Sequence, residues 1–519
     1  MIKQRVHPGS FGFRLLLVLS AILIYFLSKP SSAYPLLTWV VIVPVILAVH
    51  NASPRQAACW FYFALTGCYM AGVWWLMPAI INFTQLNPYL AFLILVVLSL
   101  MLAVPYAMIG WLVAYKQWLN KSFGVLAISA CYVVIVTLFP TPLPGHFAHS
   151  LYKHPIFLQV LDIGGVPLLL FIVVYVNVQI AKCILAVNDN WRLAATALIK
   201  ALTVLAATSW YGTMQIDDVD ASLSRGDRLK IGVIQPQLQR EDSLDQLYRM
   251  SEVLVAQNPS IDLLVWPEFP TAFSYVENRQ DRKKVNQLIT QLNKPMIIVS
   301  GYTYGQGVDP SRDPSSQYFN TAHLIDENKA VQASYSKQKL VPFFEYIPGE
   351  DSWPFLRQLL PNAHRYIPGN QSTLFHLDTN THIIPLICYE IIFPEMFHNF
   401  IEQGGNIIVN LTNDIWLGET AGSAYHFALG LLRTVEHRVP WVRATNSGIS
   451  GIVSASGRIN ETSLTPLLSK TSRVYEVSIP PERSFYSHYG DVFLYGLMGV
   501  LLTGLFKDRL YGRAIKKKT

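Results

Sequence analysis

Long hydrophobic runs and stretches of mixed sequence divide this chain into three parts. Residues 11–212 are mostly apolar, residues 216–488 mix polar and apolar positions as a soluble protein does, and residues 489–506 are apolar again. A helix that crosses a bilayer needs about 20 mostly apolar residues. By that measure the pattern predicts eight membrane spans, at 11–28, 34–50, 57–81, 89–115, 123–139, 157–187, 193–212 and 489–506. We therefore expect a transmembrane helical domain over 1–212, a second domain over 216–488, and a last span with a basic tail over 489–519.

The first apolar run could also serve as a secretory signal, but further apolar runs follow at once, which favours an uncleaved span. Charged residues make up 14% of the chain, against about 25% in a typical soluble protein. Basic residues collect on the cytoplasmic side of membrane proteins. With both basic termini in the cytoplasm, the loops on that side hold Arg55, Lys116, Lys121 and Arg192. The 216–488 domain then lies on the outer face, which is the periplasm of a Gram-negative cell, and the protein is predicted in the inner membrane.

The domain over 216–488 has the pattern of an α/β fold. Short apolar runs typical of strands occur at 229–236, 262–266, 296–301, 383–388 and 406–411. Helical spacing of apolar residues occurs at 241–257, 277–293 and 424–438, and 441–456 resembles a hairpin. Alternating strands and helices predict a sheet that is covered by helices. The sequence has no glycine-rich nucleotide loop and no basic stripe with interleaved aromatics, so neither a nucleotide site nor a nucleic-acid partner is indicated.

Candidate catalytic side chains follow the predicted strands. Glu268 ends the 262–266 run, Cys388 ends the 383–388 run, and Asn413-Asp414 follow the 406–411 run. Catalytic groups in α/β sheets gather at the carboxyl ends of the strands. The other cysteines are at positions 59, 68, 131 and 183, in or beside apolar spans, and no cysteine–histidine spacing indicates a zinc site.

The combination of Cys388, Glu268 and Lys337 suits acyl transfer through a thioester. A thiolate is the reactive form of cysteine, and a carboxylate can accept the thiol proton. A lysine ammonium can stabilise the negative charge on a tetrahedral intermediate, and the backbone N–H of Tyr389 is placed to donate a second hydrogen bond to it. Each residue alone has an ordinary explanation, as a buried thiol, a helix cap or a solvated lysine. Three in this order, each beside an apolar strand, favour a catalytic site that needs no metal or cofactor.

Three motifs resemble the nitrilase, or carbon–nitrogen hydrolase, superfamily. They are Trp266-Pro267-Glu268, Lys337 with Leu340-Val341-Pro342-Phe343, and Cys388-Tyr389-Glu390. Within it, the eight-span layout resembles the apolipoprotein N-acyltransferase family. Further segments similar to that family are Asn413–Gly418, His426-Phe427, Arg443–Gly448, Gly72–Leu76 and Asp162–Gly165. The resemblance implies an αββα sandwich beside the membrane helices.

The resemblance also implies a ping-pong reaction and its partners. Cys388 would take an acyl chain from a phospholipid, typically phosphatidylethanolamine, and pass it to the α-amine of the N-terminal S-diacylglyceryl cysteine of an apolipoprotein. Glu268 would be the general base and Lys337 the oxyanion donor. Glu345 would hold Lys337 or assist the proton transfer. Tyr389 and Glu390, next to the nucleophile, would shape the site.

Two departures from the family pattern concern substrate recognition. Phe344 stands where the family usually has glycine, and Leu238-Gln239-Arg240 stand where a loop tryptophan is common. These changes keep open a divergent paralogue that acylates another amine. Also open are a membrane-tethered amidase or hydrolase, and a scaffold or transporter. The intact catalytic trio and the few ionisable residues within the spans count against the last of these.

Overall fold

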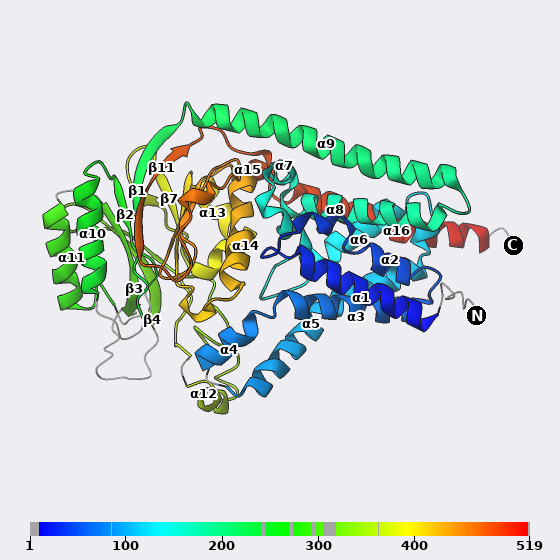
Figure 1. Cartoon of the computed structure of the whole chain (residues 1–519), viewed down its shortest axis with the longest axis horizontal. Helices are drawn as coiled ribbons and strands as arrows, with labels where there is room; N and C mark the ends of the chain where they lie inside the picture. Colours follow the sequence, from blue (N-terminus) through cyan, green and yellow to red (C-terminus); the bar gives the residue numbers. More distant parts are fainter. Residues whose placement is uncertain are drawn as a thin grey trace. The chain divides into compact units, whose positions relative to one another are not determined.

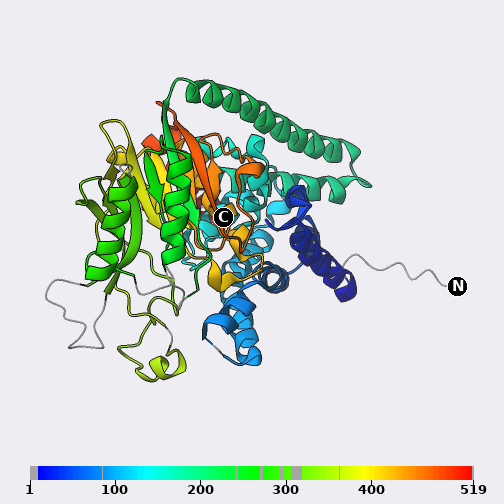
Figure 2. The ribbon, with the colours of Figure 1, turned by 60° about the vertical axis from the view of Figure 1, so that its left-hand side comes forward.

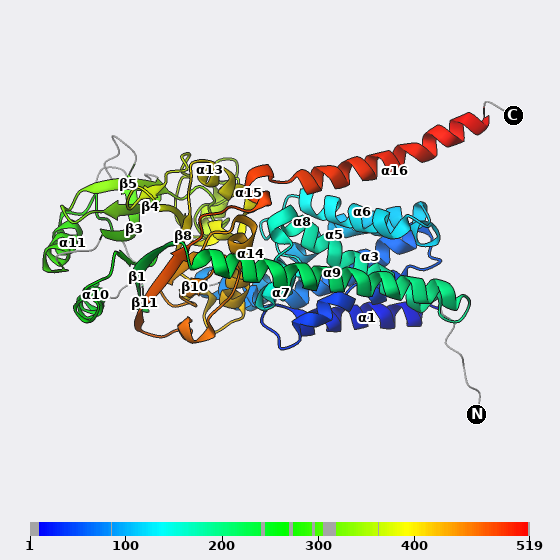
Figure 3. The same ribbon diagram turned by 90° about the horizontal axis from the view of Figure 1, so that it is seen from above.

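The computed structural model describes residues 10–84, 86–239, 244–268, 273–292, 296–304, 318–361 and 363–516. The chain forms two compact units, which are shown from three sides in Figures 1, 2 and 3. The first unit combines the N-terminal part up to Met77 with Tyr89–Ile216 and the chain from His488 onward. The second unit combines Asp217–Ser487 with the short segment Pro78–Pro88, which the sequence pattern had assigned to a membrane span and a loop.

The first unit is built of helices. Its α-helices are α1 (Phe11–Ser28), α2 (Val43–Ala48), α3 (Pro54–Gly72), α5 (Pro88–Tyr115), α6 (Gly124–Leu138), α7 (Pro155–Leu158), α8 (Leu161–Ala186), α9 (Trp191–Leu223) and α16 (Val492–Lys516), and α4 (Leu76–Thr84) runs from this unit into the second. Local sequence sets the ends of several helices. Ser53 and Gln56 form a capping box at the start of α3, with Pro54 at the first helical position, where its missing N–H costs nothing.

Among the described residues, four helices are long and apolar enough to cross a membrane, namely α1, α5, α8 and α9. The pair α3 and α4, bent by 55°, makes a fifth candidate if it counts as one span. The predicted spans at 34–50, 123–139 and 489–506 correspond to the shorter apolar helices Pro35–Ala48, Gly124–Leu138 and Val492–Thr503. A multi-span helical domain agrees with the sequence, whereas the count of eight spans stays a prediction.

Breaks in these helices have identifiable causes. In α8, Gly164 and Gly165 leave the helical conformation, and Gly165 has a φ of 60°, which favours glycine. The buried side chain of Asn177 in α8 donates to the carbonyl of Thr38 and accepts from the N–H of Ile42. It thereby adds a hydrogen-bond partner to each of these backbone groups where the 3-10 helix Pro35–Val40 passes into α2.

The second unit contains two β-sheets among the described residues. The six-stranded sheet has the order β11 (Thr471–Ile479), β1 (Asp227–Gln235), β2 (Leu263–Val265), β3 (Met296–Tyr304), β4 (Tyr318–Ile325) and β5 (Val331–Ser336). The five-stranded sheet has the order β10 (Gly451–Val453), β9 (Trp441–Thr445), β8 (Ile407–Thr412), β7 (His382–Ile387) and β6 (Phe375–His376). Strands β1, β2 and β3 are mutually parallel, as are β7, β8 and β9, and the edge strands pair antiparallel, as β1 and β11 do in Figure 3.

Helices cover the outer faces of the two sheets. Over the six-stranded sheet lie α10 (Asp245–Gln257) and α11 (Arg279–Leu292), which run side by side in Figures 1 and 2 and bury a core around Trp266. Helices α13 (Phe397–Glu402) and α14 (Gly422–His437) belong to the five-stranded sheet, where Phe427 of α14 packs on Trp441. The remaining short helices are α12 (Phe355–Leu359) and α15 (Phe485–Tyr489). The predicted αββα sandwich is confirmed.

Candidate active site

Cys388 lies at a sharp turn directly after the buried strand β7. It begins the 3-10 helix Cys388–Ile392 and has a φ of 54°, in the left-handed region that non-glycine residues rarely adopt. Its side chain is buried, with 5% of the residue exposed. Such a conformation persists only where the surroundings hold it, and it is common at functional sites. The turn therefore presents the thiol at the carboxyl end of the strand, as the sequence predicts.

Glu268 and Lys337 come from the other sheet and meet next to this thiol. Glu268 follows β2 and Lys337 follows β5, and both residues are buried. The Lys337 Nζ lies 3.4 Å from Glu268 Oε1. Asn320 of β4 donates its Nδ2–H to the same oxygen at 2.7 Å, and the backbone N–H of Asn413 donates to Glu268 Oε2 at 3.0 Å. The Glu268 carboxylate is thus held by groups from both sheets.

Glu345 is the second carboxylate at Lys337. Its Oε1 lies 2.7 Å from Lys337 Nζ, and its Oε2 accepts the backbone N–H of Val341 at 2.8 Å. The carboxylate closes a tight turn in which Phe343 has a φ of 66°. The structure therefore brings Glu268, Lys337, Cys388 and Glu345 together, with the ammonium between the two carboxylates.

Burial and charge act on these groups in opposite directions. Burial raises the pKa of Glu268, although the Lys337 ammonium partly offsets the effect. Burial would lower the pKa of Lys337, but the attraction of Glu268 and Glu345 outweighs it and raises the pKa well above its usual value. Burial and the charge of Glu268 raise the pKa of the Cys388 thiol. In the resting site the lysine is therefore charged and the cysteine is a protonated thiol, which must lose its proton as it reacts.

Glu390 connects the turn at Cys388 to the segment after β5 that contains Lys337. Its Oε2 accepts the N–H of Ile387, the residue directly before Cys388, at 2.8 Å. Its Oε1 accepts the Tyr335 hydroxyl at 2.8 Å and the N–H groups of Gln338 and Lys339 at 2.6 and 3.1 Å. Burial raises the pKa of Glu390 to about 7 despite these donors. Tyr389, the residue directly after Cys388, is half-buried and packs its ring against Phe393.

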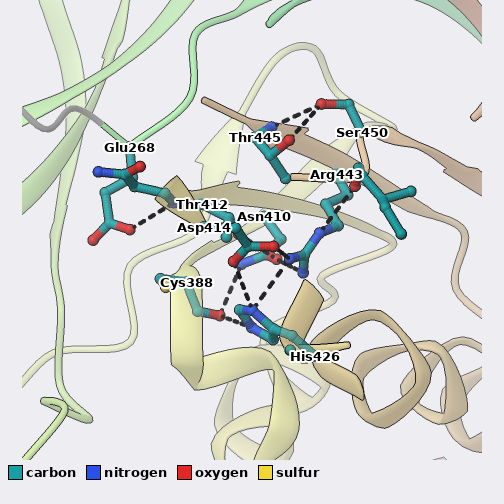
Figure 4. A network of polar contacts seen from close by, with 12 residues as sticks. Glu268, Cys388, Asn410, Thr412, Asp414, His426, Arg443, Thr445 and Ser450 are labelled. Atoms are coloured by element: carbon teal, nitrogen blue, oxygen red, sulfur yellow. Dashed lines mark hydrogen bonds and ion pairs between the residues drawn. The ribbon is translucent and has the colours of Figure 1, made fainter. Parts of the chain in front are cut away.

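A second polar cluster contacts the main chain of Cys388 (Figure 4). It consists of Asn410 in β8, Asp414 just after β8, His426 in α14 and Arg443 in β9. Asp414 is one of the candidate side chains that the sequence predicts at the strand ends, and His426 and Arg443 lie in the segments that are similar to the family. The sequence pattern assigns no role to Asn410 or Asn320. Asn410 interrupts the apolar run of β8, and that polar interruption is the sequence signal that could have revealed it, whereas the strand of Asn320 also contains Thr321 and His323 and gives no comparable signal.

Phe344 has a defined place in this unit. Its ring packs against Trp416 with centroids 4.9 Å apart, so it joins the turn that carries Glu345 to the loop after β8. In the second segment that departs from the family pattern, Leu238-Gln239-Arg240, Leu238 is buried. Its N–H donates to Asn446 Oδ1, and its carbonyl accepts from Asn446 Nδ2. Arg240 lies outside the described residues. Among the residues that the structure describes, no group of three or more His, Cys, Asp or Glu is arranged to hold a metal ion.

Comparisons with known proteins place this site in a family. The carbon–nitrogen hydrolase family model matches residues 230–496, and the chain belongs to that family. A second model, described as the apolipoprotein N-acyltransferase N-terminal domain, matches residues 20–179.

Relatives resemble the chain over most of its length. An apolipoprotein N-acyltransferase of Geobacter metallireducens is 29% identical over 497 residues, covering 92% of each chain. One of Allorhizobium ampelinum is 28% identical over 419 residues, covering 76% of this chain and 75% of its own. Among solved structures, an amidase from Nesterenkonia sp. is 20% identical with a TM-score of 0.35, covering 49% of this chain and 92% of its own. The predicted resemblance is confirmed, and the relatives together with the hydrolase domain support an acyltransferase enzyme.

Proposed function

We propose that this chain is an inner-membrane N-acyltransferase of apolipoproteins. It would take an acyl chain from a phospholipid, with phosphatidylethanolamine as the donor, and pass it to the α-amine of an N-terminal S-diacylglyceryl cysteine. The observation that carries the proposal is the meeting of Cys388, Glu268 and Lys337 in one buried site. The relatives and both family models support the choice of reaction.

In the first half-reaction the Cys388 sulfur attacks the ester carbonyl carbon of the phospholipid. Glu268 accepts the thiol proton, and Lys337 Nζ and the Tyr389 N–H donate to the oxygen that becomes negative. The intermediate then collapses, the carbon–oxygen bond to the glycerol breaks, and Glu268 returns the proton to the leaving alkoxide. The products are a lysophospholipid and an acyl thioester on Cys388.

In the second half-reaction the α-amine of the lipoprotein attacks the thioester carbon. Glu268 accepts a proton from the amine, the carbon–sulfur bond breaks, and the proton returns to the Cys388 sulfur. The product is an amide. Glu345 keeps Lys337 in place through its 2.7 Å contact, so that the ammonium is positioned for both oxyanions.

Burial of the site favours transfer to an amine over hydrolysis. The four residues Glu268, Lys337, Glu345 and Cys388 each have 8% or less of their surface exposed, which limits the access of water to a thioester. The apolar helices of the first unit suit an enzyme whose two substrates are both anchored in a bilayer. The charge distribution of the loops supports a periplasmic location for the second unit.

Intact-mass analysis of the full-length protein with phosphatidylethanolamine tests the proposal. We expect the wild type to gain one acyl chain, labile to hydroxylamine, and Cys388→Ala to gain none. Cys59→Ala, which removes an exposed cysteine of α3, is the matched control and should acylate like the wild type.

A diacylated lipopeptide should then discharge the adduct and appear as the N-acylated product. Release of free fatty acid in its presence would instead identify the membrane-tethered hydrolase. No adduct on folded wild type would contradict the phospholipid donor.

A further inference from the structure

The carbonyl oxygen of Cys388 is held by two side chains that take no part in the proposed chemistry. His426 Nε2 lies 3.1 Å from this oxygen, and Asn410 Nδ2 lies 3.3 Å from it. The residue that they hold is the one with the left-handed backbone, at a φ of 54°. Because cysteine does not prefer that conformation, contacts to its main chain are needed to maintain it.

These two side chains are fixed in turn by buried charges (Figure 4). Arg443 donates from Nη1 to Asn410 Oδ1 at 3.2 Å and from Nη2 to Asp414 Oδ2 at 2.8 Å. Strand register explains the first contact, since Arg443 of β9 is paired with Asn410 of β8. Arg443 and Asp414 are fully buried, so their opposite charges compensate each other where water cannot.

The same charges select the protonation state of His426. Its Nδ1 lies 3.1 Å from Arg443 Nη2 and 3.1 Å from Asp414 Oδ1. Burial, followed by the charge of Arg443, lowers the pKa of His426, so the ring is neutral at neutral pH. A carbonyl oxygen can only accept and guanidinium nitrogens can only donate, so a neutral ring with its hydrogen on Nε2 pairs with both the Cys388 carbonyl and Arg443. Nε2–H then donates to the carbonyl of Cys388.

The orientation of this carbonyl decides the orientation of the next N–H. A trans peptide is planar and carries its C=O and N–H on opposite sides. Holding the Cys388 carbonyl against His426 therefore directs the N–H of Tyr389 away from the histidine. In the proposed reaction this N–H is a donor to the oxyanion.

We infer that His426 is a positioning residue for acylation: it fixes the peptide plane between Cys388 and Tyr389 and thereby aims an oxyanion donor. The inference rests on the proposed function, in which an acyl oxygen becomes negative. A positioning role predicts different effects on acylation and on alkylation of Cys388, whereas a merely structural role predicts the same effect on both. Acylation of Cys388 passes through an oxyanion, whereas alkylation of the same sulfur does not.

Two rates measured on full-length protein in detergent test the inference. One is acylation of Cys388 by p-nitrophenyl butyrate in a single turnover, and the other is alkylation of Cys388 by iodoacetamide, both followed by intact mass. For His426→Ala we expect acylation to fall about 100-fold, the effect of losing an oxyanion donor, and alkylation to stay within about threefold of the wild type. His426→Gln should recover at least about tenfold of the acylation rate, because its amide nitrogen can donate to the same carbonyl.

His398→Ala is the matched control, because His398 is an exposed histidine of the same unit, with 67% of its side chain accessible. It should leave both rates unchanged. An equal fall of both rates in His426→Ala, or no recovery in His426→Gln, would overturn the inference.

If His426→Ala does not fold, His426→Gln is compared with His426→Asn, whose shorter amide cannot reach the carbonyl. Equal acylation by these two variants would also overturn the inference. Failure of phosphatidylethanolamine to acylate the wild type would overturn the proposed donor alone, because the two small-reagent rates test His426 without it.

Discussion

Two buried polar clusters flank Cys388, and they differ in their balance of charge. The cluster beside the thiol has two carboxylates, Glu268 and Glu345, around the single ammonium of Lys337. The cluster behind the carbonyl pairs the carboxylate of Asp414 with the guanidinium of Arg443, beside the neutral ring of His426. The first cluster therefore has one carboxylate in excess, and the second is neutral overall.

The difference shows how a buried carboxylate can serve two purposes in the same domain. Burial raises the pKa of Glu268, since the shared lysine compensates it only in part, and such a carboxylate can accept a proton during a reaction. Burial also acts on Asp414, but the guanidinium of Arg443 outweighs it and holds the pKa of Asp414 below its usual range. That carboxylate keeps its charge and its geometry. The unbalanced cluster is suited to chemistry and the balanced one to support.

Removal of the Glu268 carboxylate gives the largest expected effect. Glu268→Gln keeps the size of the side chain and one acceptor oxygen but cannot accept the thiol proton, so thioester formation should fall about 1,000-fold. Single-turnover acylation followed by mass measures it. Glu345→Gln is the matched control, since it removes the other carboxylate from the same lysine, and it should lose only about 10- to 100-fold. A greater loss in Glu345→Gln would reverse the roles of the two carboxylates.

Breaking the balanced cluster should affect stability rather than chemistry alone. Arg443→Met leaves the buried carboxylate of Asp414 uncompensated, which should cost about 3–5 kcal/mol of unfolding free energy. The thermal unfolding temperature of the full-length protein in detergent is the readout. The double variant Asp414→Asn with Arg443→Met removes both charges and should regain part of the loss. If the double variant is less stable than Arg443→Met, the charge pair does not explain the effect.

A fall in pH should affect the two clusters in different pH ranges. Glu268 acts as a base only when ionised, and its pKa is raised, so the rate of thioester formation should decline as the pH falls while still above the ordinary glutamate pKa of about 4.5. Asp414 has a lowered pKa, so its pairing with Arg443 is lost only at lower pH, as the pH falls through its folded-state pKa. From pH 7 to 5 the difference in unfolding temperature between wild type and the double variant Asp414→Asn with Arg443→Met, which has no carboxylate to titrate at this position, should therefore stay constant while the rate declines. A stability difference that shrinks with the rate would contradict this separation.

The smallest expected effect concerns Phe344, which lies next to the unbalanced cluster. Phe344→Gly removes the ring that packs on Trp416. We expect a bulky N-substituted maleimide to alkylate Cys388 roughly 2- to 10-fold faster, corresponding to the loss of one aromatic contact, with little change for iodoacetamide. Phe344→Leu, which keeps an apolar side chain, is the control. An equal change for both reagents would mean that the ring does not control access by size.

Much of this protein follows from local patterns in the sequence. The apolar runs indicate the helices of the first unit, because length and hydropathy are properties of single segments. The short β-branched runs ending in Glu268 and Cys388 likewise predict strands with side chains at their carboxyl ends. The hairpin expected at 441–456 forms as β9 and β10. By contrast, the joining of Pro78–Pro88 to the second unit has no signal in the pattern, since it depends on contacts distant in sequence.

The sequence by itself determined the residue types of the site and their order along the chain. It could not determine which strands share a sheet, and Glu268 and Cys388 in fact come from different sheets. It also could not show that Asn410 and Arg443 are paired in register, or that His426 contacts the carbonyl of Cys388. Strand pairing and buried hydrogen bonds join residues far apart in the chain, and their energies depend on burial, which exists only once the sheets have packed. The sequence therefore indicates which residues could react, whereas the tertiary structure decides which buried contacts position them.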